Sequence, residues 1–355
     1  MDFALSVEEK ALAEALAQNL SRVCSTARIR AWEAEQVSFD DAFLSAVAKG
    51  GFLEAGLAFG ECPSFAVLAQ LEEVAGRFLA PPILSWLTGY AAFLLGDHAL
   101  VQCLAPLVPG RSEISLTGGR ISGHAEGVPF LDRAAAVLIP LPPQRERLGE
   151  GTQDPRVALV PVKLQAPSHQ PSPVAAGEGV QAQLVATQSL VPQWSVTFED
   201  TPVGELIPVP NYEQALTRLR TCLAAWATGA GSQAIELASA YARERVQFDH
   251  PIGSYQSVQN RLVDAAIQVE QARMLVYRAA ALVDAGDDAA ADMASLARHH
   301  AGKAFVQASR AGLLTFGGYG FTVDFDIQLY FRRAKEAQIS FEPRAPWALA
   351  PAFRS

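Results

Sequence analysis

Charged residues are few in this chain, and long apolar runs are missing. Only 18% of the 355 residues are Asp, Glu, Lys or Arg, whereas 50% are hydrophobic, which is typical of a well-buried globular protein. No apolar run approaches the ~20 residues of a membrane span. The richest stretch, residues 86–95, is interrupted by Thr, Gly and Tyr. We therefore expect two or three globular domains and no membrane-spanning segment.

Cysteine is scarce as well, and its spacing excludes two kinds of site. Cys24, Cys62, Cys103 and Cys222 include no Cys-x-x-Cys pair, so neither a disulfide framework nor a zinc site is indicated. The N-terminus lacks a basic-then-apolar secretion signal, which favours a cytoplasmic location. A net charge of −9 argues against a general nucleic-acid binder, although a local arginine cluster can still hold an anionic cofactor.

Familiar catalytic and metal motifs are also missing. The sequence contains no Walker-type loop and no serine nucleophile elbow. His299 and His300 are adjacent, so they point to different faces of a helix and have no partner at ligand spacing. We expect no metal site.

The order of the periodic patterns predicts an α+β fold that is mostly α-helical. Residues 1–107 show helical spacing, with Ser6 as an N-cap and Pro81-Pro82 as an interruption. Residues 108–208 predict a small antiparallel barrel or sandwich. Residues 209–355 predict an antiparallel four-helix bundle. The β-prone runs are residues 114–123, 135–141, 157–162, 180–186 and 194–198.

The most informative segment is Tyr241-Ala-Arg-Glu-Arg-Val-Gln-Phe-Asp-His-Pro-Ile-Gly-Ser-Tyr-Gln. It ends one helical pattern and begins another, and its turn carries Arg245, Gln247 and Phe248. A guanidinium offers a planar fork of donors that suits phosphate oxygens. The string resembles the Arg-x-Gln-Phe-Gly-x-Pro-Ile-Gly-x-Phe-Gln signature of the acyl-CoA dehydrogenases.

Three further marks resemble the same family. Phe316-Gly-Gly-Tyr-Gly resembles its Gly-Gly-x-Gly turn, and Gly317 and Gly318 can bring bare backbone against a ligand. Arg220 stands where the family holds an arginine near its active site. Arg332-Arg333-Ala-Lys resembles the Arg-Asp-Ala-Lys at the start of the final family segment.

The resemblance covers essentially the full length and implies a function. Family members carry FAD and desaturate acyl-CoA thioesters between the α and β carbons, passing electrons to electron-transfer flavoprotein or a similar acceptor. The resemblance implies that Arg245, Gln247, Phe248, Gly317 and Gly318 bind FAD, and that Arg245 and Phe248 touch the pyrophosphate end of an FAD in the neighbouring subunit.

Other family residues are missing. Counting without gaps, Phe341 stands at the place of the glutamate base, Glu342 is one position late, and Leu219 occupies the alternative base position. Pro343-Arg344 replaces a Gly-Thr pair near the flavin. Residues 110–120 have no counterpart of the Thr-Glu-Pro-x-x-Gly-Ser strand that holds the flavin ring. The family Gln before the Gly-Gly turn is Leu314, and the Gly after the Phe is Asp249.

The retained residues serve a neighbour's FAD, whereas the missing ones serve a subunit's own site. This pattern resembles the accessory chain of a heteromeric acyl-CoA dehydrogenase of the steroid-degradation type, which implies an α2β2 assembly. We expect no catalytic residue in this chain, with Glu342 a weak candidate and Arg220 near the site, and a partner that binds most of the acyl-CoA. The alternatives are a homomeric dehydrogenase that uses Glu342 and a scaffold without flavin. We expect residues 211–340 to form the interface through Ala-rich segments such as Ala224–Ala227 and Ala279–Ala281.

Overall fold

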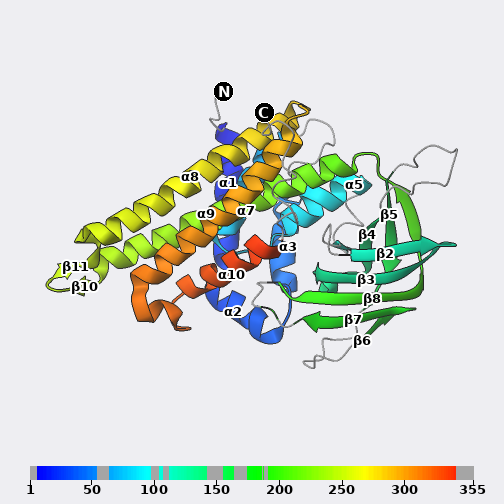
Figure 1. Cartoon of the computed structure of the whole chain (residues 1–355), viewed down its shortest axis with the longest axis horizontal. Coiled ribbons are helices and arrows are strands. Elements are labelled where there is room, and N and C mark those ends of the chain that lie inside the picture. The colour runs from blue at the N-terminus through cyan, green and yellow to red at the C-terminus, as the bar shows by residue number, and fades with distance from the viewer. Residues whose placement is uncertain are drawn as a thin grey trace. The chain divides into compact units, whose positions relative to one another are not determined.

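The computed structural model describes residues 6–53, 64–96, 104–106, 112–141, 155–163, 174–185, 187 and 191–340 (Figure 1). The chain divides into two compact units. One contains residues 1–29, 41–85 and 217–355, and the other contains residues 30–40 and 86–216.

The N-terminal part of the chain is helical, as predicted. Ser6 caps the first helix: its hydroxyl accepts a hydrogen bond from the Glu9 amide at 3.1 Å, and the Glu9 carboxylate accepts one from the Ser6 amide at 2.8 Å. A π-helix follows the Pro81-Pro82 interruption. The helices are α1 (Val7–Val23), α2 (Thr26–Glu35), α3 (Asp41–Lys49), α4 (Phe65–Arg77), η1 (Leu84–Ala92) and α5 (Phe93–Leu95).

Two sheets occupy the middle of the chain and share one apolar core. One sheet has the order β1-β4-β5-β9 and the other β2-β3-β8-β7-β6. Side chains from both sheets, including Ile139, Val160, Trp194 and Phe198, lie in that core, so the arrangement is a sandwich. The strands are β1 (Leu104–Pro106), β2 (Ser112–Thr117), β3 (Arg120–Pro129), β4 (Ala136–Leu141), β5 (Arg156–Pro161), β6 (Val174–Gly177), β7 (Val180–Val185), β8 (Gln193–Pro202) and β9 (Glu205–Pro208).

Each predicted β-prone run overlaps a strand, whereas β1, β6 and β9 were not foreseen. These three are only three or four residues long. An alternation this short does not stand out from the surrounding Pro, Gly and Gln residues in sequence. The pairing is antiparallel except for β1 with β4, which is parallel.

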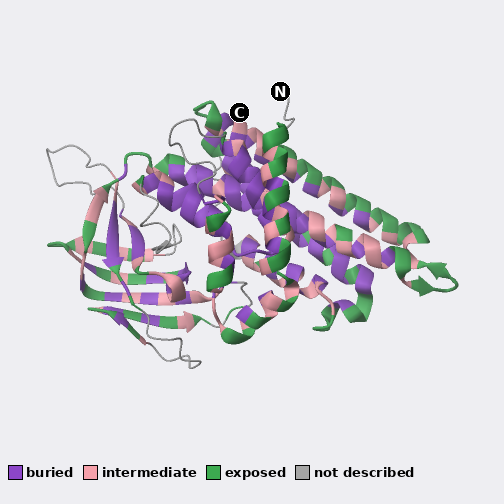
Figure 2. Cartoon of the chain, turned by 180° about the vertical axis from the view of Figure 1, so that it is seen from behind, coloured by how far each residue is buried: buried purple, intermediate pink, exposed green. Residues whose placement is uncertain are grey.

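The C-terminal part forms the predicted four-helix bundle. Its helices are α7 (Tyr212–Glu244), α8 (Gln256–Asp284), α9 (Ala290–Phe316) and α10 (Ile327–Ser340). Leu262, Val269, Ala272 and Val276 of α8 are buried at helical spacing, as the sequence indicated. Figure 2 shows buried residues on the inner faces of these helices and exposed residues on their outer faces.

Small residues bring α4 and α7 into close contact within one unit. A Cβ added to Gly229 of α7 would lie 1.8 Å from the carbonyl oxygen of Glu73, and one added to Gly76 would lie 1.9 Å from that of Trp226. Ala224, Ala225, Trp226 and Ala227 are all buried in the chain itself, and the Trp226 indole donates to the carbonyl oxygen of Ala80. The expectation that this segment faces another subunit is therefore wrong.

Within the described residues, no helix is both long enough and apolar enough to span a bilayer.

Candidate functional site

A short hairpin follows the first helix of the bundle. Strands β10 (Val246–Gln247) and β11 (His250–Pro251) pair antiparallel, and only Phe248 and Asp249 connect them. Both connecting residues have positive φ, 54° and 67°. Two-residue hairpins of this kind favour Asn-Gly, because positive φ crowds the Cβ of most residues. An aromatic residue at this position is unusual.

The ring of Phe248 does not pack in the hydrophobic core. The residue is 86% exposed, the largest exposed fraction among the large hydrophobic residues described. A strained backbone conformation that presents an apolar side chain to solvent gives no folding benefit. Such features concentrate at binding sites.

The side chain of Arg245 is held in place by an aromatic ring. Its guanidinium carbon lies 5.4 Å from the ring centroid of Tyr319, within range of a cation–π interaction. Tyr319 belongs to η4 (Gly317–Phe321), the turn that follows α9. The structure therefore brings together the two sequence motifs that were expected to act together.

Four aromatic rings extend this contact into the end of the bundle. Tyr241 stacks on Phe316 at 4.1 Å between centroids, and Phe325 contacts Tyr241, Phe316 and Tyr319 at 6.1, 5.4 and 5.8 Å. Aromatic pairs in this range are each worth about 0.5–1.5 kcal/mol beyond area burial. The cluster thus fixes the hairpin relative to the glycine turn. Its members are dispersed along the chain, so no local pattern in the sequence indicated it.

The glycine turn leaves its backbone accessible. Gly317 has φ of 63°, and a Cβ added at Gly317 or Gly318 would meet no atom within 4 Å. Positive φ explains the need for glycine at the first position. At the second position the open space is compatible with close approach of a ligand.

Gln247 has a local role in the hairpin. Its side-chain amide donates to the carbonyl oxygen of Val246 at 2.8 Å, and its own backbone carbonyl accepts from the Tyr255 hydroxyl at 3.0 Å. These bonds stabilise the turn. The prediction that Gln247 also contacts a cofactor stays a prediction.

The remaining predicted residues lie elsewhere. Arg220 is half-buried on α7, next to the buried Leu219. Since α7 continues without interruption to Glu244, a rise of ~1.5 Å per residue places Arg220 and Arg245 roughly 37 Å apart along the axis. The two arginines therefore lie far apart on the bundle, and their predicted site roles stay predictions. Phe341, Glu342, Pro343 and Arg344 lie outside the described residues.

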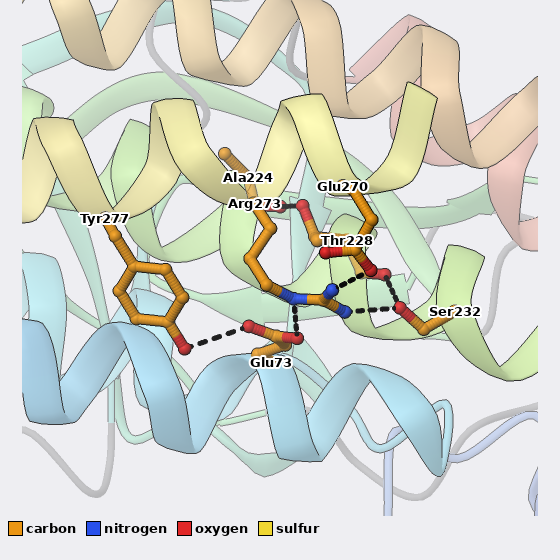
Figure 3. A network of polar contacts seen from close by, with 7 residues as sticks. All are labelled: Glu73, Ala224, Thr228, Ser232, Glu270, Arg273 and Tyr277. Carbon is orange, nitrogen blue, oxygen red and sulfur yellow. Dashed lines mark hydrogen bonds and ion pairs between the residues drawn. The ribbon is translucent and has the colours of Figure 1, made fainter. Parts of the chain in front are cut away.

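A polar network that no sequence motif indicated joins α4, α7 and α8 (Figure 3). Arg273 donates to Glu73 and to Ser232, both at 2.7 Å, and also contacts Glu270. The Tyr277 hydroxyl donates to Glu73 at 3.1 Å. Burial and then the Glu73 charge raise the pKa of Tyr277, so the phenol stays protonated. This network stabilises the helix packing.

A second buried polar group lies nearby on α4. Glu72 is fully buried and accepts a hydrogen bond from the Ser85 hydroxyl at 2.7 Å. Burial raises the pKa of Glu72 to about 8, and the Ser85 hydrogen bonds oppose this only in part. The same burial, with the Glu72 charge, raises the pKa of the Cys222 thiol. Both groups are protonated at neutral pH.

Helices, a β-sandwich and a four-helix bundle, in this order, are the architecture of the acyl-CoA dehydrogenase fold. Residues 210–341 match the family described as "Acyl-CoA dehydrogenase, C-terminal domain". The chain is 29% identical over 249 residues to acyl-CoA dehydrogenase IpdE2 of Mycolicibacterium smegmatis, covering 64% of this chain and 78% of the relative. It is 34% identical over 143 residues to the probable acyl-CoA dehydrogenase FadE25 of Mycobacterium tuberculosis. That match covers 39% of this chain, and the chain spans only 36% of the length of that relative.

Solved structures extend the likeness in fold to nearly the whole chain. The ChsE4–ChsE5 complex from Mycobacterium tuberculosis has a TM-score of 0.79 at 21% identity, covering 96% of this chain and 95% of that one. A chain of the Tcur3481–Tcur3483 steroid ACAD has a TM-score of 0.77 at 21% identity, covering 94% of each chain. These structures show the same fold over nearly the whole chain, and the sequence likeness to the acyl-CoA dehydrogenase C-terminal domain covers residues 210–341.

Proposed function

We propose that this chain is the accessory subunit of a heteromeric, FAD-dependent acyl-CoA dehydrogenase, and that it supplies the pyrophosphate side of an FAD site centred in a partner subunit. The proposal rests on the arrangement of residues at one end of the helical bundle. There Arg245, Phe248 and the Gly317-Gly318 turn are presented together, and Phe248 is exposed at a cost in backbone strain.

The residues present fit the phosphate end of FAD. Arg245 provides a permanent cation and a fork of donors, which bind phosphate oxygens through charge-assisted hydrogen bonds. The open backbone at Gly317 and Gly318 allows close approach, and the exposed ring of Phe248 offers a face for ribose or adenine. When bound, FAD accepts hydride from the β-carbon of the acyl thioester. The residues of this chain would bind the pyrophosphate end of FAD, and the partner subunit would provide the base for proton transfer.

The distance between Arg220 and Arg245 supports the proposal that Arg245 contributes to an FAD site centred in a second chain. Roughly 37 Å of helix separates the arginine that resembles an active-site residue from the one that resembles an FAD residue. One compact ligand site does not extend over this distance. The hairpin is therefore suited to a cofactor whose reactive ring lies in another polypeptide.

The proposed partner is a homologous acyl-CoA dehydrogenase subunit that carries the glutamate base and binds most of the substrate. The names of two similar structures describe a ChsE4–ChsE5 complex and a steroid ACAD, so a bulky steroid-derived acyl-CoA is the substrate class we propose. We propose that the interface with the partner subunit lies within residues 211–340, on the outer face of α8. Its exposed apolar residues Val263, Ile267 and Met274 share one side of that helix.

Co-expression tests the proposal. The chain purified alone should be colourless, and the chain co-purified with an active-type homologue encoded nearby should be yellow, with a flavin spectrum that bleaches on adding acyl-CoA. Arg245→Ala should reduce the flavin content of that complex, whereas Arg243→Ala, at an exposed neighbouring position, should not. A chain that is yellow and active alone would instead indicate the homomeric enzyme, and a complex without flavin would indicate a scaffold.

A further inference from the structure

The hairpin that exposes Phe248 is short. Its strands β10 and β11 contain two residues each, and Figure 1 shows the hairpin at the tip where α7 ends and α8 begins. Pro251 in β11 has no backbone N–H and cannot donate to the ladder. A two-stranded hairpin by itself is at best marginally stable in water. Contacts from outside the two strands must therefore help to order the turn.

The backbone of the turn adds a cost. Phe248 and Asp249 have φ of 54° and 67°, in the left-handed region where the Cβ of an L-residue is crowded. The acyl-CoA dehydrogenase signature has glycine in the place of Asp249, and glycine adopts positive φ without this crowding. The chain thus has a strained residue where the signature has an unstrained one.

A side chain from α8 contacts the turn. The hydroxyl of Tyr255, the N-cap residue of α8, donates to the backbone carbonyl of Gln247 at 3.0 Å. This carbonyl directly precedes the two residues with positive φ. The signature has phenylalanine in the place of Tyr255, and a phenyl ring has no hydroxyl to donate. The hydrogen bond therefore accompanies the second difference between this chain and the signature in the same hairpin.

The segment that holds Tyr255 is itself fixed by hydrogen bonds. The Ile252 amide donates to the carbonyl of Arg245 at 2.8 Å, and the side-chain amide of Gln259 donates to the carbonyl of Gly253 at 2.8 Å. These bonds join the base of the hairpin to the start of α8. The half-buried ring of Tyr255 can thus hold the turn from a fixed point.

We propose that Tyr255 is a positioning residue of the FAD site, and that its hydroxyl offsets the strain at Asp249. The hydrogen bond keeps Phe248 and Arg245 in the arrangement that meets the cofactor. This role rests on the proposed function, since FAD is the ligand. A ligand that binds only the ordered hairpin loses apparent affinity in proportion to the fraction of chains in which the hairpin is ordered.

Flavin retention in the co-purified complex tests this role. Tyr255→Phe should weaken retention by about two- to tenfold, the effect of losing one hydrogen bond of ordinary strength. Adding Asp249→Gly should recover most of this loss, because the double variant has both residues of the signature and an unstrained turn. Unchanged retention in Tyr255→Phe would overturn the proposal. The same loss with and without Asp249→Gly would refute the compensation.

Tyr277→Phe is the matched control. It removes a hydroxyl from the same helix, where Tyr277 donates to Glu73 at 3.1 Å. The two tyrosines are 22 residues apart on α8, which is roughly 33 Å along the axis. Tyr277→Phe should lower the thermal midpoint of the chain and leave flavin retention unchanged. Equal losses of retention in the two variants would show that general destabilisation is the cause, and the positioning role would fail.

Hydrogen exchange in the chain alone tests the hairpin without the cofactor. Tyr255→Phe should accelerate exchange in peptides covering residues 246–252 by about two- to tenfold, whereas Tyr277→Phe should not. Unchanged exchange in Tyr255→Phe would show that the hydroxyl does not order the turn. A complex that contains no flavin would contradict the proposed function and the cofactor role with it, while the exchange rates would still decide whether Tyr255 holds the hairpin.

Discussion

Arg245 and Tyr319 lie in contact, with 5.4 Å between the guanidinium carbon and the ring centroid. One follows the first helix of the bundle and the other follows the third. The contact with Tyr319 holds the Arg245 side chain in one orientation and leaves it partly exposed. An arginine held in this way loses less conformational entropy when it binds an anion than one that moves in solvent.

We expect Arg245→Ala to weaken FAD retention in the assembled enzyme by on the order of 1.5–3 kcal/mol, because a charge-assisted hydrogen bond to phosphate is lost. Equilibrium dialysis of the complex measures this change. Tyr319→Phe, which preserves the ring face, should retain FAD as the wild type does. Unchanged retention in Arg245→Ala would remove the residue from the cofactor site.

Asp249→Gly should stabilise the chain by about 0.5–1 kcal/mol, since glycine adopts a φ of 67° without steric cost. Thermal unfolding measures the shift. The matched control is Asp264→Gly, at an exposed position inside α8, which should destabilise by about 1 kcal/mol. A lower midpoint for Asp249→Gly would show that the aspartate stabilises the hairpin.

Glu342→Gln should leave turnover of the assembled enzyme within a few-fold of the wild type. A general base must lie within hydrogen-bond reach of the proton that it removes, and ungapped counting puts Phe341 at that position. Steady-state kinetics with matched flavin content decide the matter. A collapse of kcat at full flavin loading would identify Glu342 as the base.

The buried Glu72 should make stability depend on pH. Because burial raises its pKa from 4.5 to about 8, the folded chain keeps a proton that the unfolded chain releases between these values. The free energy of unfolding should therefore fall as pH rises from about 5 to 8, by at most ~1.4 kcal/mol per pH unit from this group.

Urea unfolding of Glu72→Gln checks this dependence. The variant keeps an oxygen acceptor for Ser85 and should lose much of the pH dependence, so its advantage over the wild type should grow with pH. Glu244→Gln is the control, because it leaves the buried group intact. Parallel stability profiles for the wild type and Glu72→Gln would contradict the assignment.

Removing one member of the Glu73–Arg273 pair should destabilise the bundle. The side chains are 15% and 22% exposed, so Glu73→Gln leaves a largely buried guanidinium with weaker compensation and should cost about 2–3 kcal/mol. Glu270→Gln, whose side chain is 57% exposed, should cost less than ~1 kcal/mol. Equal costs in chemical denaturation would show that burial does not decide the strength of these pairs.

Local patterns were sufficient to predict the order of the helical, β-rich and helical parts of the chain. The Ser6 N-cap, the Pro81-Pro82 interruption and the buried face around Val269 depend on neighbours within a turn or two, and the structure confirms them. The motifs at Arg245 and Gly317 were also recognisable, because each is a continuous string. The short strands β1, β6 and β9 were missed because three or four residues do not establish a period.

The sequence by itself determined the fold class and the residue types that could meet a phosphate. Only the tertiary structure placed Arg245 against Tyr319, buried Ala224–Ala227 inside the chain and brought Glu73 to Arg273. These outcomes depend on which helix faces pack together, and close packing is a property of many distant residues at once. Helical periodicity indicates that a face is buried. It does not specify which surface covers that face.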